Sequence, residues 1–234
     1  MGACCVGRTK DETHWSSVLS IIKTKARQGQ AAGLQTFIRK VAKEESGCFK
    51  RAVRVAYFWP REGELIQVSV WESPSSLKRH KMSLRDWHKQ ELSGVAELPP
   101  AFDFEGALWR SYVRTAPMLG HFSRVVGYKL KEEEEAEEPS VGCMSQDTGF
   151  RAQVLARAWD LLVSPECAGD ILVAAVAAMP SPLVLISWQV FESQDACTRY
   201  MEEVRPRLLE ALDPVLDGPP FFSEQGHFKT LIPA

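Results

Sequence analysis

The stretch Val70–His80, VWESPSSLKRH, is matched 120 residues later by Val190–Tyr200, VFESQDACTRY. In both copies an apolar run ends in an aromatic residue and Glu-Ser, and a segment with helical spacing follows. Apolar runs of this length are typical of buried strands, and Ser is a favoured residue at a helix N-terminus. The sequence therefore predicts the same strand-to-helix junction twice in one chain.

The match between the two segments continues in the same register for about forty residues. Matched pairs include Ile66 and Ile186, Pro99 and Pro219, Phe102 and Phe222, and Gly106 and Gly226. A fixed internal period of this length indicates a duplicated domain, because a solenoid needs three or more shorter repeats.

Each copy predicts the order strand, helix, strand, strand, helix, strand. In the first copy we expect strands at 15–26, 51–59, 64–71 and 101–113 and helices at 31–46 and 73–92. In the second copy we expect strands at 121–130, 169–179, 182–191 and 220–231 and helices at 150–162 and 195–216. A sheet with helices on one face leaves its other face apolar, so the two sheets are expected to pack on each other. The predicted class is α+β.

The period divides the chain into a leader at 1–14, a first repeat at 15–114, a linker at 115–120 and a second repeat at 121–234. The first strands of the two repeats lie about 104 positions apart rather than 120, so the second repeat contains an insertion, at 131–148. Six of seven consecutive residues in this insertion are glutamate. Such a charge run predicts a solvated acidic loop, and a partner-binding role is the alternative.

A βαββαβ unit whose third strand ends in VWES or VFES resembles the antibiotic biosynthesis monooxygenase superfamily, the dimeric α+β barrel proteins. The resemblance extends from about Trp15 in two copies, and it implies tandem ferredoxin-like repeats packed as an intramolecular barrel in a monomer. For activity, it implies a cofactor-independent monooxygenase acting on a small aromatic or quinol-type substrate. The alternative is a non-catalytic small-molecule-binding or interaction protein on the same scaffold.

The heme-degrading branch of this superfamily uses an Asn in the first strand and a Trp and a His in the second helix. The present sequence contains no asparagine. Its helical Trp position is held by His80 and Tyr200, and the heme-ligand position by Gln90 and Glu210, with His88 two residues before Gln90. We therefore expect no heme and no other cofactor.

His80 and Tyr200 are the candidate catalytic residues, because the helical spacing directs both side chains toward the sheet. A histidine on an apolar cavity wall can take a proton from a phenolic substrate, whereas packed core side chains are the alternative reading for both. Trp71, His88 and Trp188 are the further pocket candidates. If one repeat has kept a site, the first is expected, since it alone has two histidines on this stripe.

Composition limits the partners and the compartment. The formal net charge is −2, which predicts no nucleic-acid binding, and no histidine lies at metal-ligand spacing from a Cys or carboxylate. Six cysteines without a C-x-x-C pair, and no span of roughly 20 apolar residues, favour a reduced, cytoplasmic protein. Gly2, Cys4 and Cys5 resemble a dual-acylation signal that would tether the chain to a membrane surface, and a plain leader is the alternative.

Overall fold

The computed structural model describes residues 17–44, 52–83, 86–132, 149–164, 168–180 and 183–232. The expected leader, with Gly2, Cys4 and Cys5, lies outside these residues, and so does nearly all of the expected acidic insertion. No helix within these residues is long and apolar enough to cross a membrane.

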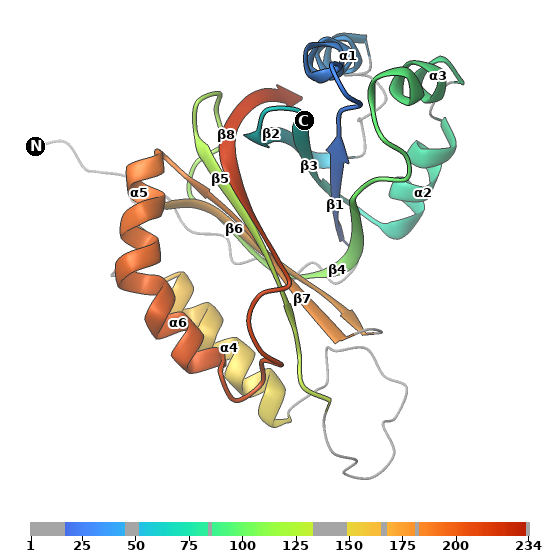
Figure 1. Ribbon diagram of the computed structural model, residues 1–234. Helices are drawn as coiled ribbons and strands as arrows, with labels where there is room; N and C mark the ends of the chain where they lie inside the picture. The colour runs from blue at the N-terminus through green and yellow to red at the C-terminus, as the bar shows by residue number, and fades with distance from the viewer. Residues whose placement is uncertain are drawn as a thin grey trace, which may run out of the picture.

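Both repeats contain the expected elements in the expected order (Figure 1). The first contains β1 (Val18–Lys25), α1 (Ala31–Glu44), β2 (Ala52–Arg61), β3 (Glu64–Trp71), α2 (Pro74–Ser83), α3 (Asp86–Val95) and β4 (Phe102–Val113). The second contains β5 (Phe122–Lys129), α4 (Phe150–Leu162), η2 (Ala168–Asp170), β6 (Ile171–Pro180), β7 (Leu183–Phe191), α5 (Gln194–Arg199), η3 (Tyr200–Val204), α6 (Arg205–Leu212) and β8 (Phe222–Ile232). The turn between the repeats contains Gly120, whose φ of 91° suits glycine.

The eight strands form one closed antiparallel barrel in the order β1-β3-β2-β8-β5-β7-β6-β4. Each repeat contributes four consecutive strands to this order, and the two sets are joined by the pairs β2–β8 and β4–β6. In both pairs the second strand of one repeat lies beside the last strand of the other. The barrel therefore has an internal pseudo-twofold arrangement. The predicted α+β class, with tandem repeats closing one intramolecular barrel, is confirmed.

The last strand of each repeat is long enough to pair with both repeats. Along β4, residues 102–107 pair with β1 and residues 107–113 pair with β6. Along β8, residues 222–227 pair with β5 and residues 227–232 pair with β2. Each of these strands therefore passes from its own sheet to the sheet of the other repeat.

The matched glycines Gly106 and Gly226 lie where β4 and β8 make this passage. A Cβ atom built on Gly226 would lie 2.4 Å from the carbonyl oxygen of Trp59 in β2. A Cβ atom built on Gly106 would lie 3.0 Å from the carbonyl oxygen of Ala178 in β6. At Gly226 two backbones approach too closely for a side chain, whereas at Gly106 an added Cβ would also lie 2.5 Å from the ring of Phe104.

Strand alternation separates a barrel interior from two helix-covered outer faces. Along β3, Ile66, Val68 and Val70 face the interior, whereas Leu65 and Trp71 pack under the helices. Helices α1–α3 cover one side of the barrel, and α4–α6 cover the opposite side (Figure 1). The described residues therefore form three apolar cores, one inside the barrel and one beneath each helical layer.

A group of charged side chains joins the repeats near one end of the barrel. The Lys23 amine lies 2.9 Å from a carboxylate oxygen of Glu64 and 2.5 Å from one of Glu224. Arg61 lies 3.0 Å and 3.3 Å from the same two carboxylates. Burial by itself lowers the pKa of Lys23, but the hydrogen bonds to Glu224 and Glu64 outweigh it and raise the pKa above its ordinary value.

The segment expected as the second helix of each repeat is largely helical. In the first repeat its described residues lie mainly in α2 and α3. At 195–216 the helix ends at Leu212 and contains the π turn η3, closed by a hydrogen bond from the Arg205 N–H to the Tyr200 carbonyl. Pro206 explains this turn, because it has no N–H for the next α-helical bond.

We predict that Gly226→Ala destabilises the protein by about 2 kcal/mol or more, since the added methyl group collides with the backbone of β2. Chemical denaturation followed by circular dichroism measures the change in unfolding free energy. Gly94→Ala is the matched control, because a Cβ on Gly94 in α3 meets no atom within 4 Å. It should be neutral or stabilising by up to about 1 kcal/mol. Equal stabilities of the two variants would contradict the close approach at Gly226.

Candidate functional site

Each repeat encloses a cavity between the outer face of its sheet and the helices that cover it. The first-repeat cavity has a volume of about 380 Å³ and is lined from β1, β3 and α1–α3. The second-repeat cavity has a volume of about 40 Å³ and is lined from β5, β7, α4, η3 and α6. The two cavities occupy corresponding places, but only the first has room for an aromatic ring system.

Aromatic side chains from four elements form part of the wall of the first-repeat cavity. Trp71 of β3 lies against His80 of α2, with ring centroids 4.7 Å apart and the planes tilted by 34°. His88 of α3 meets Phe37 of α1 edge-on, with centroids 6.5 Å apart. His80 is 9% exposed and His88 4% exposed. The structure thus brings Trp71, His80 and His88 to one cavity, and a role for them in binding or turnover stays a prediction.

The sheet side of the first-repeat cavity carries small polar groups. Ser20 and Gln67, from β1 and β3, line it together with the phenol-bearing Tyr57. The Trp71 indole N–H donates a hydrogen bond of 2.8 Å to the hydroxyl of Ser69, which holds the indole against the sheet. The cavity therefore combines flat apolar surfaces with a few polar atoms, as small-molecule sites commonly do.

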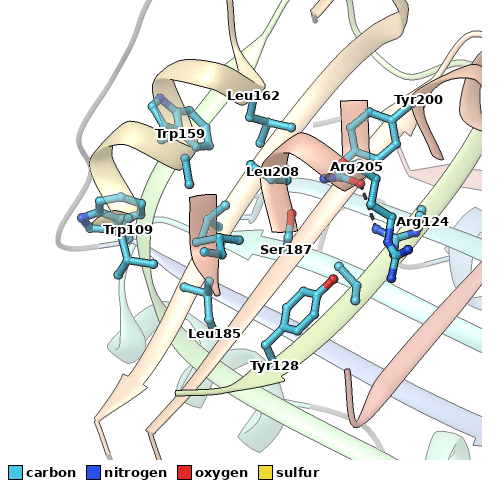
Figure 2. Close-up of a pocket in the computed structure, with 16 residues that line it drawn as sticks. Trp109, Arg124, Tyr128, Trp159, Leu162, Leu185, Ser187, Tyr200, Arg205 and Leu208 are labelled. Atoms are coloured by element: carbon cyan, nitrogen blue, oxygen red, sulfur yellow. Dashed lines mark hydrogen bonds between the residues drawn. The ribbon is translucent and has the colours of Figure 1, made fainter. Parts of the chain in front are cut away.

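The second-repeat cavity contains a buried chain of hydrogen bonds (Figure 2). The Arg124 guanidinium donates to the Gln189 side-chain oxygen at 3.2 Å, and the Gln189 amide donates to the Tyr200 hydroxyl at 2.9 Å. These three side chains are each at most 2% exposed. Arg124 is paired with Gln189 in the strand register, as Ser20 is with Ser69 in the first repeat. A charged network thus occupies the place that two serines hold in the other half.

Tyr200 is the first residue of the π turn η3. Its ring packs on Phe191, with centroids 5.2 Å apart, and its hydroxyl accepts a hydrogen bond from Gln189. Burial raises the pKa of this hydroxyl to about 12, although Arg124 and the hydrogen bond to Gln189 act in the opposite direction. Tyr200 is therefore a neutral hydroxyl near pH 7, suited to donating a hydrogen bond rather than to removing a proton.

Trp188 does not line either of these helix-covered cavities. Its side chain lies inside the barrel beside Ile186 and Val190, and its indole N–H donates to the Ser123 hydroxyl at 2.9 Å. The reason is strand alternation: Trp188 and Phe191 differ by an odd number of positions, so they face opposite sides of β7. Phe191, rather than Trp188, is the counterpart of Trp71.

Sequence reasoning missed Arg124 and Gln189. The sequence did contain a signal for Arg124. The first strands of the two repeats lie about 104 positions apart, and this offset aligns Arg124 with Ser20. A charged residue between the apolar positions of β5 faces the helices, where a buried cation needs compensation. Comparing the two repeats position by position would have singled it out.

The residues at the family's heme-ligand position do not fit a heme. Gln90 in α3 and Glu210 in α6 are exposed, and neither lines a cavity of its repeat. Within the described part of the chain, no three His, Cys, Asp or Glu side chains are grouped as a metal site.

No family model matches the chain, and no curated protein is similar to it in sequence. Solved structures are similar in fold. A candidate monooxygenase from Fusobacterium nucleatum aligns with a TM-score of 0.67 at 8% identity, over 93% of both chains. A candidate monooxygenase from Lactobacillus acidophilus gives 0.60 at 8% identity, over 93% of this chain and 95% of that one. An anthrone oxidase-like protein gives 0.59 at 12% identity, over 94% and 93%. The chain thus shares its α+β barrel fold with these solved structures.

The raised pKa of Tyr200 predicts a specific alkaline instability. The unfolded tyrosine ionises near its ordinary value of 10, whereas the folded one resists ionisation up to about 12. Stability supported by the neutral hydroxyl is therefore complete below pH 10 and is lost as the pH rises toward 12. Relative to Tyr200→Phe, the parent protein should lose about 2 kcal/mol of unfolding free energy over this range. Urea titrations at each pH measure this difference.

Tyr112→Phe is the control, because Tyr112 is only half-buried. Its alkaline loss of stability should follow that of the parent. A parallel loss in Tyr200→Phe would show that Tyr200 ionises normally in the folded state.

Proposed function

We propose that the first-repeat cavity binds a small aromatic or quinol-type molecule and that the protein oxygenates it without a cofactor. The observation that carries this proposal is the 380 Å³ cavity with His80, His88 and Trp71 on its wall. An indole offers a flat apolar surface for an aromatic ring. Imidazole is the side chain whose ordinary pKa lies closest to neutrality, so it can accept a phenolic proton.

The chemistry needs only a base, a substrate and molecular oxygen. Removal of a proton by His80 turns an anthrone-like substrate into an electron-rich anion that transfers an electron to oxygen directly. The net reaction converts one CH₂ group and O₂ into one C=O group and H₂O, so the substrate supplies all of the electrons. The enclosing helices exclude solvent from the anion while it reacts.

Two features of the protein support this proposal beyond the cavity itself. The fold is shared with candidate monooxygenases and an anthrone oxidase-like protein. Sequence identities of 8–12% indicate a common fold only. The first repeat also has both imidazoles on one cavity, whereas the second has a hydroxyl and a leucine at the corresponding positions, Tyr200 and Leu208.

A non-catalytic role is the second candidate. It is favoured because neither repeat has the Asn, Trp and His that the heme-degrading branch uses. The cavity therefore lacks the groups for that branch's chemistry. In this role the same cavity binds an aromatic ligand without converting it. Acylation at Gly2, Cys4 and Cys5 would bring the protein to a membrane surface. We also propose that the protein acts as a monomer, since the two repeats already satisfy each other's strand edges.

Oxygen uptake with anthrone and substituted hydroquinones tests the enzymatic proposal. The parent should consume oxygen above the buffer rate and yield the quinone product. His80→Ala should reduce kcat/KM by about 10² or more if His80 is the base. Tyr200→Phe should leave the rate unchanged, because Tyr200 lies in the other cavity.

Thermal melts separate catalysis from packing. His80→Leu preserves an apolar wall, so a stable but inactive His80→Leu protein supports the role of a base. Absence of oxygen uptake, together with ligand-induced stabilisation that His80→Ala weakens, would favour the binding role. Absence of both effects with every compound would contradict a first-repeat site.

A further inference from the structure

Arg124 is a buried cation with no anionic partner among the described residues. It is 2% exposed, and its guanidinium donates to the neutral side chain of Gln189. No carboxylate of the described residues lies within ion-pair distance of it. Burial of an unpaired cation is costly, whereas Arg holds carboxylates through parallel N–H donors. The second-repeat cavity therefore lacks a negative charge at this place.

Three other polar atoms around this cavity lack a hydrogen-bond partner. Three of its lining side chains have a buried polar atom with no hydrogen-bond partner among the described residues: the indole N–H of Trp159, the hydroxyl of Ser187 and the Nε–H of Arg205. Trp159 is 2% exposed and Ser187 9% exposed. Two of these atoms can only donate, and a serine hydroxyl can donate as well.

Tyr200 adds a further donor. Its hydroxyl oxygen accepts the hydrogen bond from Gln189, which leaves its own hydrogen available to a ligand. Figure 2 shows the Tyr200, Arg205 and Arg124 side chains toward one side of the cavity and Trp109 and Trp159 toward the other. The cavity thus has a cationic, donor-rich side and an apolar aromatic side.

We propose that the second-repeat cavity is a binding site for a small planar oxyanion of the carboxylate type, held by Arg124 with Tyr200, Ser187 and Arg205. The size of the cavity limits the ligand. A water molecule needs roughly 10–15 Å³ of such space, so a cavity of about 40 Å³ holds about three or four non-hydrogen atoms. Formate, acetate and bicarbonate have this size and charge, and each presents two oxygens in a plane to a guanidinium.

This site is separate from the one proposed in the first repeat. At the position of Arg124 the first repeat has Ser20, and at the position of Gln189 it has Ser69. The duplication has therefore produced one roomy cavity with imidazoles and one small cavity with a guanidinium. The oxyanion site can be tested without assuming any oxygenase activity.

Isothermal titration calorimetry of the full chain with sodium formate, acetate and bicarbonate tests the proposal, at constant ionic strength and with chloride as the comparison anion. At least one of the three oxyanions should bind, and more tightly than chloride. Arg124→Met should weaken that binding by at least about tenfold, since a charge-assisted bidentate contact is lost. Ser187→Ala and Tyr200→Phe should weaken it less.

Ser20→Ala is the matched control, because it alters the corresponding position of the first repeat and should leave oxyanion binding unchanged. If Arg124→Met fails to fold, Arg124→Lys keeps the charge but loses the planar pair of donors, and it should reduce the preference for oxyanions over chloride. The proposal is overturned if none of the oxyanions binds, if chloride binds as tightly, or if the folded Arg124 variant binds as the parent does.

Discussion

The pairing of β4 with β6 and of β8 with β2 is the constraint on which the rest of this structure depends. A four-stranded sheet alone would leave two edges with open backbone hydrogen-bonding groups, and one apolar face without cover. In this chain each repeat supplies one long last strand, and that strand completes the sheet of the other repeat. Gly106 and Gly226 permit the two backbone approaches at which the strands cross over.

Closure of the barrel also decides where a ligand can bind. The interior is filled by aliphatic and aromatic side chains from both repeats, including Trp188. Two cavities lie instead between the outer sheet faces and the helices, one in each repeat. Because both repeats belong to one chain, their cavities could change independently, which two identical subunits cannot do. In this structure the first repeat has Ser20 and His80 where the second has Arg124 and Tyr200.

Much of this architecture could be predicted from the sequence, because the two copies match in a constant register and therefore indicate the same fold twice. The period identified both copies, the strand order within them and the position of Gly106 and Gly226. Helical spacing predicted that His80 and His88 lie on the same face, toward the sheet. These inferences depend only on periodicity, which is a local property of the chain.

Other features depended on local details that the periodicity conceals. The π turn before Pro206 interrupts a helix that was expected to be regular. Trp188, a pocket candidate from the sequence, lies inside the barrel and lines neither helix-covered cavity. Arg124 was missed because the insertion displaces the first strand of the second repeat, so that a gapless comparison never aligned it with Ser20. The size of each cavity depends on side-chain packing from several elements, which no single segment reveals.

Cross-linking at the seam tests most directly whether the two repeats close one barrel within one chain. Ser111 of β4 and Ala175 of β6 are direct partners across this seam, so cysteines at both positions can form a disulfide. After mild oxidation of Ser111→Cys/Ala175→Cys, peptide mass spectrometry should find this link, and a non-reducing gel should show it in a species of 26.2 kDa, the mass of one chain. The same link found only in a covalent dimer would contradict the intramolecular barrel.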